Sequence, residues 1–355
     1  EPILYFFVAR KAESDLCADY IQEIENKLGI PTMGRAERFP EIFEYLMKLS
    51  IERPITLFID EFQEFFKVNK SVYSDMQRIW DMYHTKAHIN LIVCGSIFSM
   101  MTKIFKDKKE PLYNRQTRFM SIKPFTPAVL KEIMAEYNPN YTSEDLLALY
   151  SFTGGVAKYV QLLVDAGATT KTKMLNHIIK ADSVFLGEGK AILIEEFGKD
   201  YGVYFSILSA IARGKTLRSE IEQIVGREIG GYLTKLEKEY EVITKNQPIF
   251  EKSSTKNVRY TIEDNFFTFW FRFIYKYNYM LEIENYDAVK TIINRDYETF
   301  SGKMLERYFK RVLMESKAYT RIGSWWDRKG ENEIDIVAEN ELNDEAVFIE
   351  VKRKE

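Results

Sequence analysis

The sequence predicts an α/β fold in which a parallel sheet comes first. A helical unit, a three-helix unit with a hairpin and a small α/β tail follow it. Strand and helix patterns alternate up to about residue 125, the rhythm of a parallel sheet with helices on its faces. Ile55–Ile59 is a continuous apolar run, as in strands buried on both faces. The chain of 355 residues is long enough for several domains. We expect them at residues 1–125, 126–200, 201–280 and 281–355.

Each element of the first unit rests on a local pattern. The first helix, for example, carries Leu16, Tyr20, Ile24 and Leu28 at the i+4 spacing of one helix face. The strands are short apolar runs bounded by polar residues. The expected strands are Leu4–Val8, Ile55–Ile59 and Ile89–Cys94, and the expected helices span 11–28, 39–49 and 72–84.

Two adjacent acids, Asp60 and Glu61, follow the strand Ile55–Ile59. Open α/β sheets bind ligands at the carboxyl ends of their strands. In P-loop NTPases this pattern is the Walker B motif, whose first acid holds Mg²⁺ and whose second acid orients or deprotonates the attacking water. The sequence therefore predicts ATP and Mg²⁺ as cofactors, with Asp60 as the metal and cofactor ligand and Glu61 as the catalytic residue. The alternative is a strand that ends in a solvated acidic turn.

Two more residues fit catalysis at the same edge. Ser96 follows the strand Ile89–Cys94 and, beside Asp60, would reach a γ-phosphate or its water. The alternative is that Ser96 is a turn residue and the N-cap of the next helix. Arg115, in the run Leu112–Phe119, would neutralise transition-state charge within the chain or on a neighbouring subunit. The alternative for Arg115 is an ordinary arginine in a surface turn.

The phosphate-binding loop of this class is absent from the sequence. A P-loop NTPase wraps phosphates with G-x-x-x-x-G-K-[ST], and no such run occurs in the 355 residues. The chain begins with Glu1 rather than Met and enters a strand at once. We therefore expect the Walker A segment to lie upstream of Glu1.

The composition is that of a soluble globular protein of the cytoplasm. Hydrophobic residues make up 46% and charged residues 29% of the chain, with a net charge of −3. No apolar run approaches the roughly 18 residues of a membrane span, so no membrane partner is expected. Cys17 and Cys94 show no metal or disulfide spacing, which fits a reducing compartment. With this charge, nucleic-acid binding requires a local basic face.

Residues 126–200 are predicted to form an all-helical lid. The residues Thr153-Gly154-Gly155 mark a tight turn between two of its helices, and Ser143 is the expected N-cap of the second. The expected helices are Thr126–Tyr137, Ser143–Phe152 and Val156–Ala166.

Residues 201–280 show three helix patterns and then a hairpin, the order of a winged helix-turn-helix. Such a unit places its third helix in a DNA groove or docks a protein, and both alternatives stay open. On the third helix, Lys235 and Lys238 favour DNA, whereas Glu237 and Glu239 oppose it. The expected helices are Tyr204–Ala212, Arg218–Val225 and Ile229–Glu239, and the expected strands are Glu241–Thr244 and Val258–Ile262. The aromatic segment Asn265–Tyr279 indicates a core rather than a base-stacking platform.

The tail holds a second group of acids. A helix Tyr297–Ser316 carries Glu306, and strands at Glu333–Ala338 and Val347–Lys352 carry Asp335, Glu350 and Lys352. Cleaving a phosphodiester requires carboxylates that bind Mg²⁺ and a cation near the reacting oxygens. Asp335 and Glu350 are thus expected as metal ligands, and these two acids, Glu306 and Lys352 as the catalytic set. Two acids and a lysine also occur together by chance.

Taken together, these segments resemble the prokaryotic archaeal-type ATPase family, AAA+/STAND-like proteins that carry a carboxy-terminal domain of unknown function. The resemblance covers the whole chain, and the order of the segments is more specific than any one of them. It rests on Leu57–Glu61, Cys94–Ser96, Leu112–Arg115, Thr153–Val156, Phe266–Phe273 and Ile322–Val337.

The resemblance implies that a P-loop precedes the first strand. It also implies a tail similar to PD-(D/E)XK nucleases, whose pattern Asp335, Glu350 and Lys352 match. Glu306 matches the helix acid of that fold, whereas Glu333-Ile334 replaces the proline of its first motif. Hydrolysis of ATP, coupled to DNA, is the first functional hypothesis. A Mg²⁺-dependent DNA nuclease and a non-enzymatic scaffold that binds DNA or a protein are the alternatives. A nucleotide is the expected ligand, and DNA, a protein partner and a homo-oligomer stay open.

Overall fold

The computed structural model describes residues 2–29, 34–252 and 256–353, and the chain divides into two compact units. Unit 1 comprises residues 1–120 and unit 2 comprises residues 121–355. The first boundary lies close to the expected position at 125, and the finer division of unit 2 stays a prediction. No helix in the described part of the chain is both long and apolar enough to cross a membrane.

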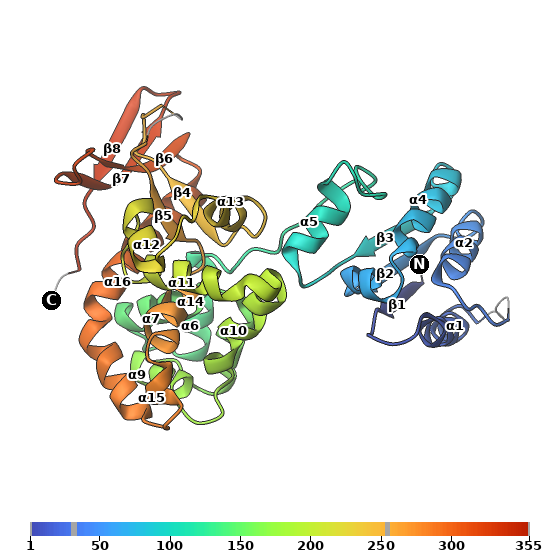
Figure 1. The fold of residues 1–355 in the computed structure, drawn as a ribbon, viewed down its shortest axis with the longest axis horizontal. Helices are drawn as coiled ribbons and strands as arrows, with labels where there is room; N and C mark the ends of the chain where they lie inside the picture. The colour runs from blue at the N-terminus through green and yellow to red at the C-terminus, as the bar shows by residue number, and fades with distance from the viewer. Residues whose placement is uncertain (1, 30–33, 253–255, 354–355) are drawn as a thin grey trace. The chain divides into compact units, whose positions relative to one another are not determined.

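Unit 1 is built on a three-stranded parallel sheet, which confirms the predicted fold class. Its strands β1 (Ile3–Phe7), β2 (Ile55–Asp60) and β3 (Ile89–Val93) lie in the order β1-β2-β3, so that β2 is central. Figure 1 shows α1, α2 and α4 on one side of this sheet. The helices of unit 1 are α1 (Glu13–Leu28), α2 (Phe39–Leu49), α3 (Phe65–Val68), α4 (Ser71–Tyr83) and α5 (Phe98–Lys106), with a 3₁₀ turn at Phe62–Glu64.

The prediction that both faces of the sheet are covered is wrong within unit 1. Leu4 and Phe6 of β1 are fully buried against the helices, whereas Ile3, Tyr5 and Phe7 are 61%, 50% and 49% exposed. Alternate residues of a strand point to opposite faces, so these exposed residues mark the open face. The run Ile55–Ile59 has the pattern of a strand buried on both faces, but the described residues of unit 1 cover only one face of the sheet.

Unit 2 begins with a helical region. Thr142, not Ser143, caps the second of these helices: its hydroxyl accepts a hydrogen bond from Asp145 N, and the Asp145 carboxylate accepts one from Thr142 N. The reciprocal pair satisfies two free N–H groups at once, which a single Ser143 hydroxyl would not do. The helices are α6 (Pro127–Tyr137), α7 (Ser143–Thr153), α8 (Ala157–Asp165), α9 (Lys171–Ile178) and α10 (Val184–Phe197).

Three helices and an antiparallel hairpin follow, in the order that the sequence pattern predicts. Leu233 and Leu236 of the third helix are buried, so its opposite face is the one that meets solvent. The elements are α11 (Tyr201–Ala212), α12 (Arg218–Val225), α13 (Gly230–Lys238), β4 (Ile243–Asn246) and β5 (Arg259–Ile262).

The aromatic segment is the centre of the core of unit 2, as predicted. It forms α14 (Asn265–Phe269), a π-helical stretch (Trp270–Tyr275) and α15 (Asn278–Leu281). Phe266, Phe269 and Phe271 are fully buried. Their rings are therefore inside unit 2 and are not available as a stacking surface.

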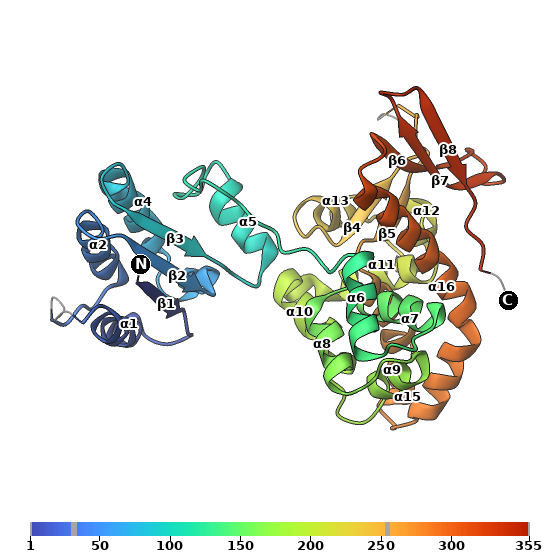
Figure 2. The same cartoon turned by 180° about the vertical axis from the view of Figure 1, so that it is seen from behind.

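The tail consists of a long helix and an antiparallel sheet. The helix α16 (Tyr286–Ser316) precedes β6 (Arg321–Trp326), β7 (Glu333–Asn340) and β8 (Glu345–Ile349). Figure 2 shows α16 along the edge of unit 2, with these strands beyond its end. The last strand ends at Ile349, so Glu350 and Lys352 follow the strand rather than lie in it, which corrects their expected placement.

Candidate active site

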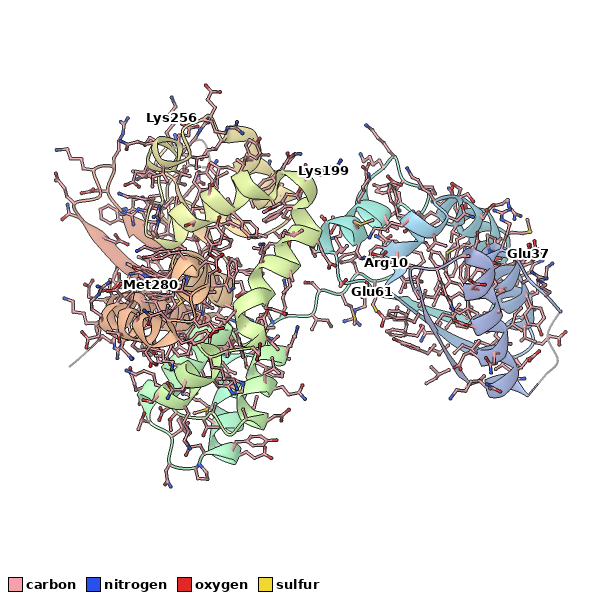
Figure 3. All side chains as sticks on the ribbon, turned by 60° about the horizontal axis from the view of Figure 1, so that its bottom comes forward. Arg10, Glu37, Glu61, Lys199, Lys256 and Met280 are labelled. Carbon is pink, nitrogen blue, oxygen red and sulfur yellow. The ribbon has the colours of Figure 1, made fainter. Side chains whose placement is uncertain are left out.

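The two acids of the predicted Walker B motif lie at the carboxyl end of the central strand. Asp60 is the last residue of β2 and is in register with Phe7 of β1, on the open face of the sheet. Glu61 follows in the left-handed region, at φ 54° and ψ 37°. A residue other than glycine is seldom found there, and such strain is concentrated at functional sites. Figure 3 labels Glu61 and Arg10, which lie at the same end of the sheet.

Asp60 is held by three hydrogen-bond donors. The Tyr5 hydroxyl donates to Oδ2 at 2.6 Å, and the Cys94 thiol and the Glu61 N–H donate to Oδ1 at 2.7 and 2.9 Å. Burial alone would raise the pKa of Asp60, but these three donors outweigh it and hold the pKa below its usual value. Asp60 is therefore a carboxylate at neutral pH, as a metal ligand must be.

The pKa values of two of these donors, Tyr5 and Cys94, shift upward. The bond to Asp60 raises the pKa of the Tyr5 hydroxyl to about 12, and burial together with Asp60 raises the pKa of the Cys94 thiol to about 12. Both groups are therefore protonated at neutral pH and keep donating. They fix the orientation of the carboxylate without adding charge to the site.

The sequence places Ser96 beside Asp60, whereas the structure brings the Ser96 hydroxyl to Glu61. The Ser96 hydroxyl donates to Oε2 of Glu61 at 3.0 Å. The side-chain amide of Gln63 donates to the same oxygen. Ser96 thus contacts the second acid of the motif rather than Asp60, and α5 begins only at Phe98.

Arg115 lies elsewhere in unit 1. Its guanidinium forms a bidentate pair with Asp81, with Nε–Oδ1 at 3.0 Å and Nη2–Oδ2 at 2.7 Å. It also donates to the carbonyl oxygens of Pro111 and Tyr113. None of these contacts reaches Asp60 or Glu61, so the structure does not bring Arg115 to the two acids.

The residues at this edge suit Mg²⁺ but do not include a phosphate cradle. Mg²⁺ prefers carboxylate and hydroxyl oxygens and keeps several waters, and Asp60 and Ser96 supply such oxygens. The backbone loop and lysine that grip the phosphates would come from G-x-x-x-x-G-K-[ST], which the 355 residues lack. Within the described part of the chain, no group of three or more His, Cys, Asp or Glu residues is arranged to hold a metal by itself.

The acids of the tail are brought together only in part. The Asp335 carboxylate accepts a hydrogen bond from Val351 N at 2.8 Å, which places the segment after β8 beside β7. Glu350 pairs with Lys352 at 3.5 Å, with both side chains largely exposed. Burial raises the pKa of Glu306, and the nearby charges of Asp335 and Glu333 act in the same direction, against a hydrogen bond from Lys303.

Sequence reasoning missed three residues of the site in unit 1 and two in the tail. Tyr5, Gln63 and Cys94 contact Asp60 or Glu61, and Lys303 and Glu333 act on Glu306. Gln63 and Cys94 could have been found, because each is within two residues of a predicted site residue. Tyr5 could be found only from the strand register.

Comparisons with known proteins agree with this geometry. The profile of an ATPase domain predominantly from Archaea matches residues 7–163, and that of archaeal and bacterial proteins of unknown function matches residues 270–355. The Walker-type ATPase PABY2304 of Pyrococcus abyssi has a similar fold, with a TM-score of 0.55 and 18% identity over 76% of this chain and 84% of that one. The parallel sheet thus belongs to a Walker-type ATPase fold.

Sequence relatives add to these profile matches. An uncharacterised protein of Methanocaldococcus jannaschii, MJECL04, is 33% identical over 340 residues, which are 92% of this chain and 72% of that protein. A second uncharacterised protein of the same organism, MJ0424, is 34% identical over 56 residues, 16% of this chain and 54% of that protein. The chain belongs to the prokaryotic archaeal-type ATPase family, and its residues 7–163 match the ATPase domain of that family.

Proposed function

We propose that the chain hydrolyses ATP at the carboxyl edge of β2, with Asp60 holding Mg²⁺ and Glu61 directing the attacking water. The observation that carries this proposal is the pairing of an ionised, firmly held Asp60 with an anchored Glu61 at the end of a central parallel strand. Mg²⁺, when bound, neutralises charge on the phosphates. The 355 residues contain no G-x-x-x-x-G-K-[ST] run to bind the phosphates.

Each residue has a separate task in this proposal. Tyr5 and Cys94 hold the carboxylate of Asp60, and Oδ2, which accepts from Tyr5 where Oδ1 accepts from both Cys94 and Glu61 N, is the oxygen that would bind the metal. Glu61 accepts a hydrogen bond, or a proton, from the water that attacks the γ-phosphate. Ser96 anchors Glu61 and stands next to the position where the water would be. Because Arg115 is tied to Asp81, we propose that its role in transition-state charge requires release of that pair.

Isothermal calorimetry tests this proposal. Mg²⁺–ATP is titrated into the protein as its gene encodes it, and the intact mass of that protein is measured alongside. Micromolar binding that weakens strongly in Asp60→Ala is the expected result. The 355-residue chain of 41.8 kDa is assayed in parallel. Absence of binding to the gene product would contradict the proposed function, whereas absence only in the 355-residue chain would place the phosphate cradle outside it.

We further propose that α11, α12, α13 and the β4–β5 hairpin form a winged helix that couples the ATPase to DNA. Thr234, Lys235 and Lys238 of α13 are exposed, whereas Tyr232 packs on Tyr204 with ring centroids 5.3 Å apart. The exposed face is thus more basic than the whole helix, although Glu239 is also exposed. A helix of this charge would contact phosphates more than bases.

Replacing both lysines, Lys235→Ala with Lys238→Ala, is expected to weaken duplex DNA binding about equally for all sequences. The slope of log K against log salt should fall by about 2, because two phosphate contacts are lost. Fluorescence anisotropy with a labelled duplex at several salt concentrations measures both. The control is Lys131→Ala, an exposed lysine of α6. If the wild-type protein does not bind DNA at low salt, the winged helix is a protein-docking unit.

A second candidate function is metal-dependent cleavage of DNA by the tail. The observation that favours it is the hydrogen bond from Val351 N to the Asp335 carboxylate, which brings the segment with Glu350 and Lys352 beside β7. The pattern is incomplete, since Glu350 and Lys352 are exposed and pair with each other.

If the tail is a nuclease, nicking of supercoiled DNA with Mg²⁺ or Mn²⁺ is expected to be lost in Lys352→Ala. A cation beside the reacting oxygens contributes on the order of 100-fold or more in rate. Gel analysis of plasmid nicking measures the effect, with Lys329→Ala, an exposed lysine before β7, as control. A wild-type protein that never nicks DNA would leave the tail as a binding or structural module.

A further inference from the structure

The buried side chain of Gln63 lies between Glu61 and Ser96. Gln63 is 0% exposed and belongs to the 3₁₀ turn that follows Glu61. Its Nε2 donates to Oε2 of Glu61 and makes a longer contact of 3.4 Å with the Ser96 hydroxyl oxygen. A carboxylate can only accept hydrogen bonds, so the nitrogen and not the oxygen of the amide must face Glu61. The amide therefore joins both residues of the proposed hydrolytic pair.

Gly95 provides the space that this amide needs. A Cβ atom at position 95 would come within 2.0 Å of Oε1 of Gln63 and 2.7 Å of Sδ of Met101. Contacts this short require the neighbouring side chains to move. The glycine between Cys94 and Ser96 is thus explained by the side chains of Gln63 and Met101 rather than by its own backbone conformation, and the amide of Gln63 makes the closer contact.

Stability alone does not favour glutamine at this position. Oε1 of Gln63 is buried and finds no hydrogen-bond partner among the described residues. A buried carbonyl oxygen without a partner costs about 1–3 kcal/mol, and an apolar side chain of the same length would avoid that cost. A buried polar group that is only half satisfied therefore calls for a reason other than packing.

The backbone around Gln63 is held firmly enough to position its amide. The Tyr73 hydroxyl lies 3.2 Å from the carbonyl oxygens of both Phe62 and Gln63 and is buried with them. The N–H of Phe62 donates to the carbonyl oxygen of Cys94 at 2.9 Å, which ties the turn to the end of β3. The amide consequently extends from a fixed turn toward Glu61 and Ser96.

We propose that Gln63 is the positioning residue of the hydrolytic site. Its amide and the Ser96 hydroxyl both hold Oε2 of Glu61, which leaves Oε1 as the acceptor for the attacking water. Gly95 belongs to the same arrangement, because a side chain at position 95 would occupy the space of the amide. This inference rests on the proposed function, because Gln63 only orients Glu61, and Glu61 is the residue that acts on the water.

The test is Gln63→Met, which keeps the length of the side chain and removes the donor. The kcat for ATP is expected to fall by roughly 10- to 100-fold, as when a supporting hydrogen bond to a catalytic group is lost, with KM within about two-fold. The melting temperature should stay unchanged or rise, because the unpartnered carbonyl is gone. The matched control is Gln22→Met, an exposed glutamine of α1. A wild-type kcat in Gln63→Met overturns the proposal, as does a fall in kcat that merely follows a fall in stability.

Gln63→Glu supplies a readout that a purely structural role would not change. An ionised glutamate can only accept hydrogen bonds, so it would repel Glu61 instead of holding it, and kcat should fall while KM stays within about two-fold. A wild-type kcat in Gln63→Glu contradicts the proposal. Glu61→Gln is assayed alongside: if it turns over ATP like the wild type, the proposed function has failed, whereas an inactive Glu61→Gln beside a fully active Gln63→Met rejects the role of Gln63 alone.

Discussion

Glu61→Gln is expected to lower kcat for ATP by on the order of 10²–10⁴-fold, the usual contribution of a positioned general base. Glutamine keeps the size of the side chain but cannot take a proton and offers a weaker acceptor to the water. Binding of Mg²⁺–ATP should be nearly unchanged, because Asp60 and its three donors are untouched. Turnover measured by phosphate release, with the dissociation constant from calorimetry, separates the two effects.

Asp60→Ala is expected to weaken the binding of Mg²⁺–ATP as well as turnover. It removes the metal-binding carboxylate and leaves the Tyr5 hydroxyl and the Cys94 thiol without their acceptor, so both metal affinity and turnover should fall. Turnover should then depend on a much higher Mg²⁺ concentration. The control for both variants is Glu37→Gln, an acid of unit 1 whose side chain is 70% exposed and which Figure 3 labels. Unchanged turnover in both Asp60→Ala and Glu61→Gln would reject the ATPase site.

The parts of this site that the sequence predicts are those set by local pattern. A continuous apolar run ending in Asp60-Glu61 identifies both the strand and the residues at its end, because the chain direction alone places them at the carboxyl edge. Ser96 follows by the same logic from β3. The strand register is not a local property, and it brings Tyr5 of β1 onto the face of Asp60. The sequence of β1 by itself shows only a tyrosine in an apolar strand.

The errors in the prediction have the same origin. The cap of α7 moves from Ser143 to Thr142 because two side chains, not one, decide it. The last strand ends before Glu350 because Val351 N turns to the Asp335 carboxylate instead of continuing the ladder. The role of Arg115 stays a proposal, but its pairing with Asp81 of α4 could not be read from the sequence, because the position of α4 relative to residue 115 depends on the tertiary fold. Each departure involves a partner distant in sequence or a competition between neighbouring groups.

Phe266→Ala is expected to destabilise unit 2 by about 3–5 kcal/mol, the range for removing a fully buried phenylalanine. The ring of Phe266 is 0% exposed and lies 4.1 Å from the ring of Tyr159, centroid to centroid. It also contacts the ring of Phe185 at 6.3 Å. Alanine leaves a cavity that these rigid aromatic neighbours cannot fill, because their own positions are fixed by further packing.

Urea unfolding followed by circular dichroism measures this loss, and hydrogen exchange shows whether it is confined to residues 121–355. Ile283→Ala, at a side chain 72% exposed, is the control and should change the free energy of unfolding by no more than about 0.5 kcal/mol. The variant Phe266→Ala also separates the two interpretations of the aromatic segment, as part of the core or as a base-stacking surface. If Phe266 belonged to a base-stacking surface, alanine would weaken single-stranded DNA binding by about 1–3 kcal/mol and leave stability intact. A core residue gives the reverse, since stability falls first and any loss of binding follows only from unfolding.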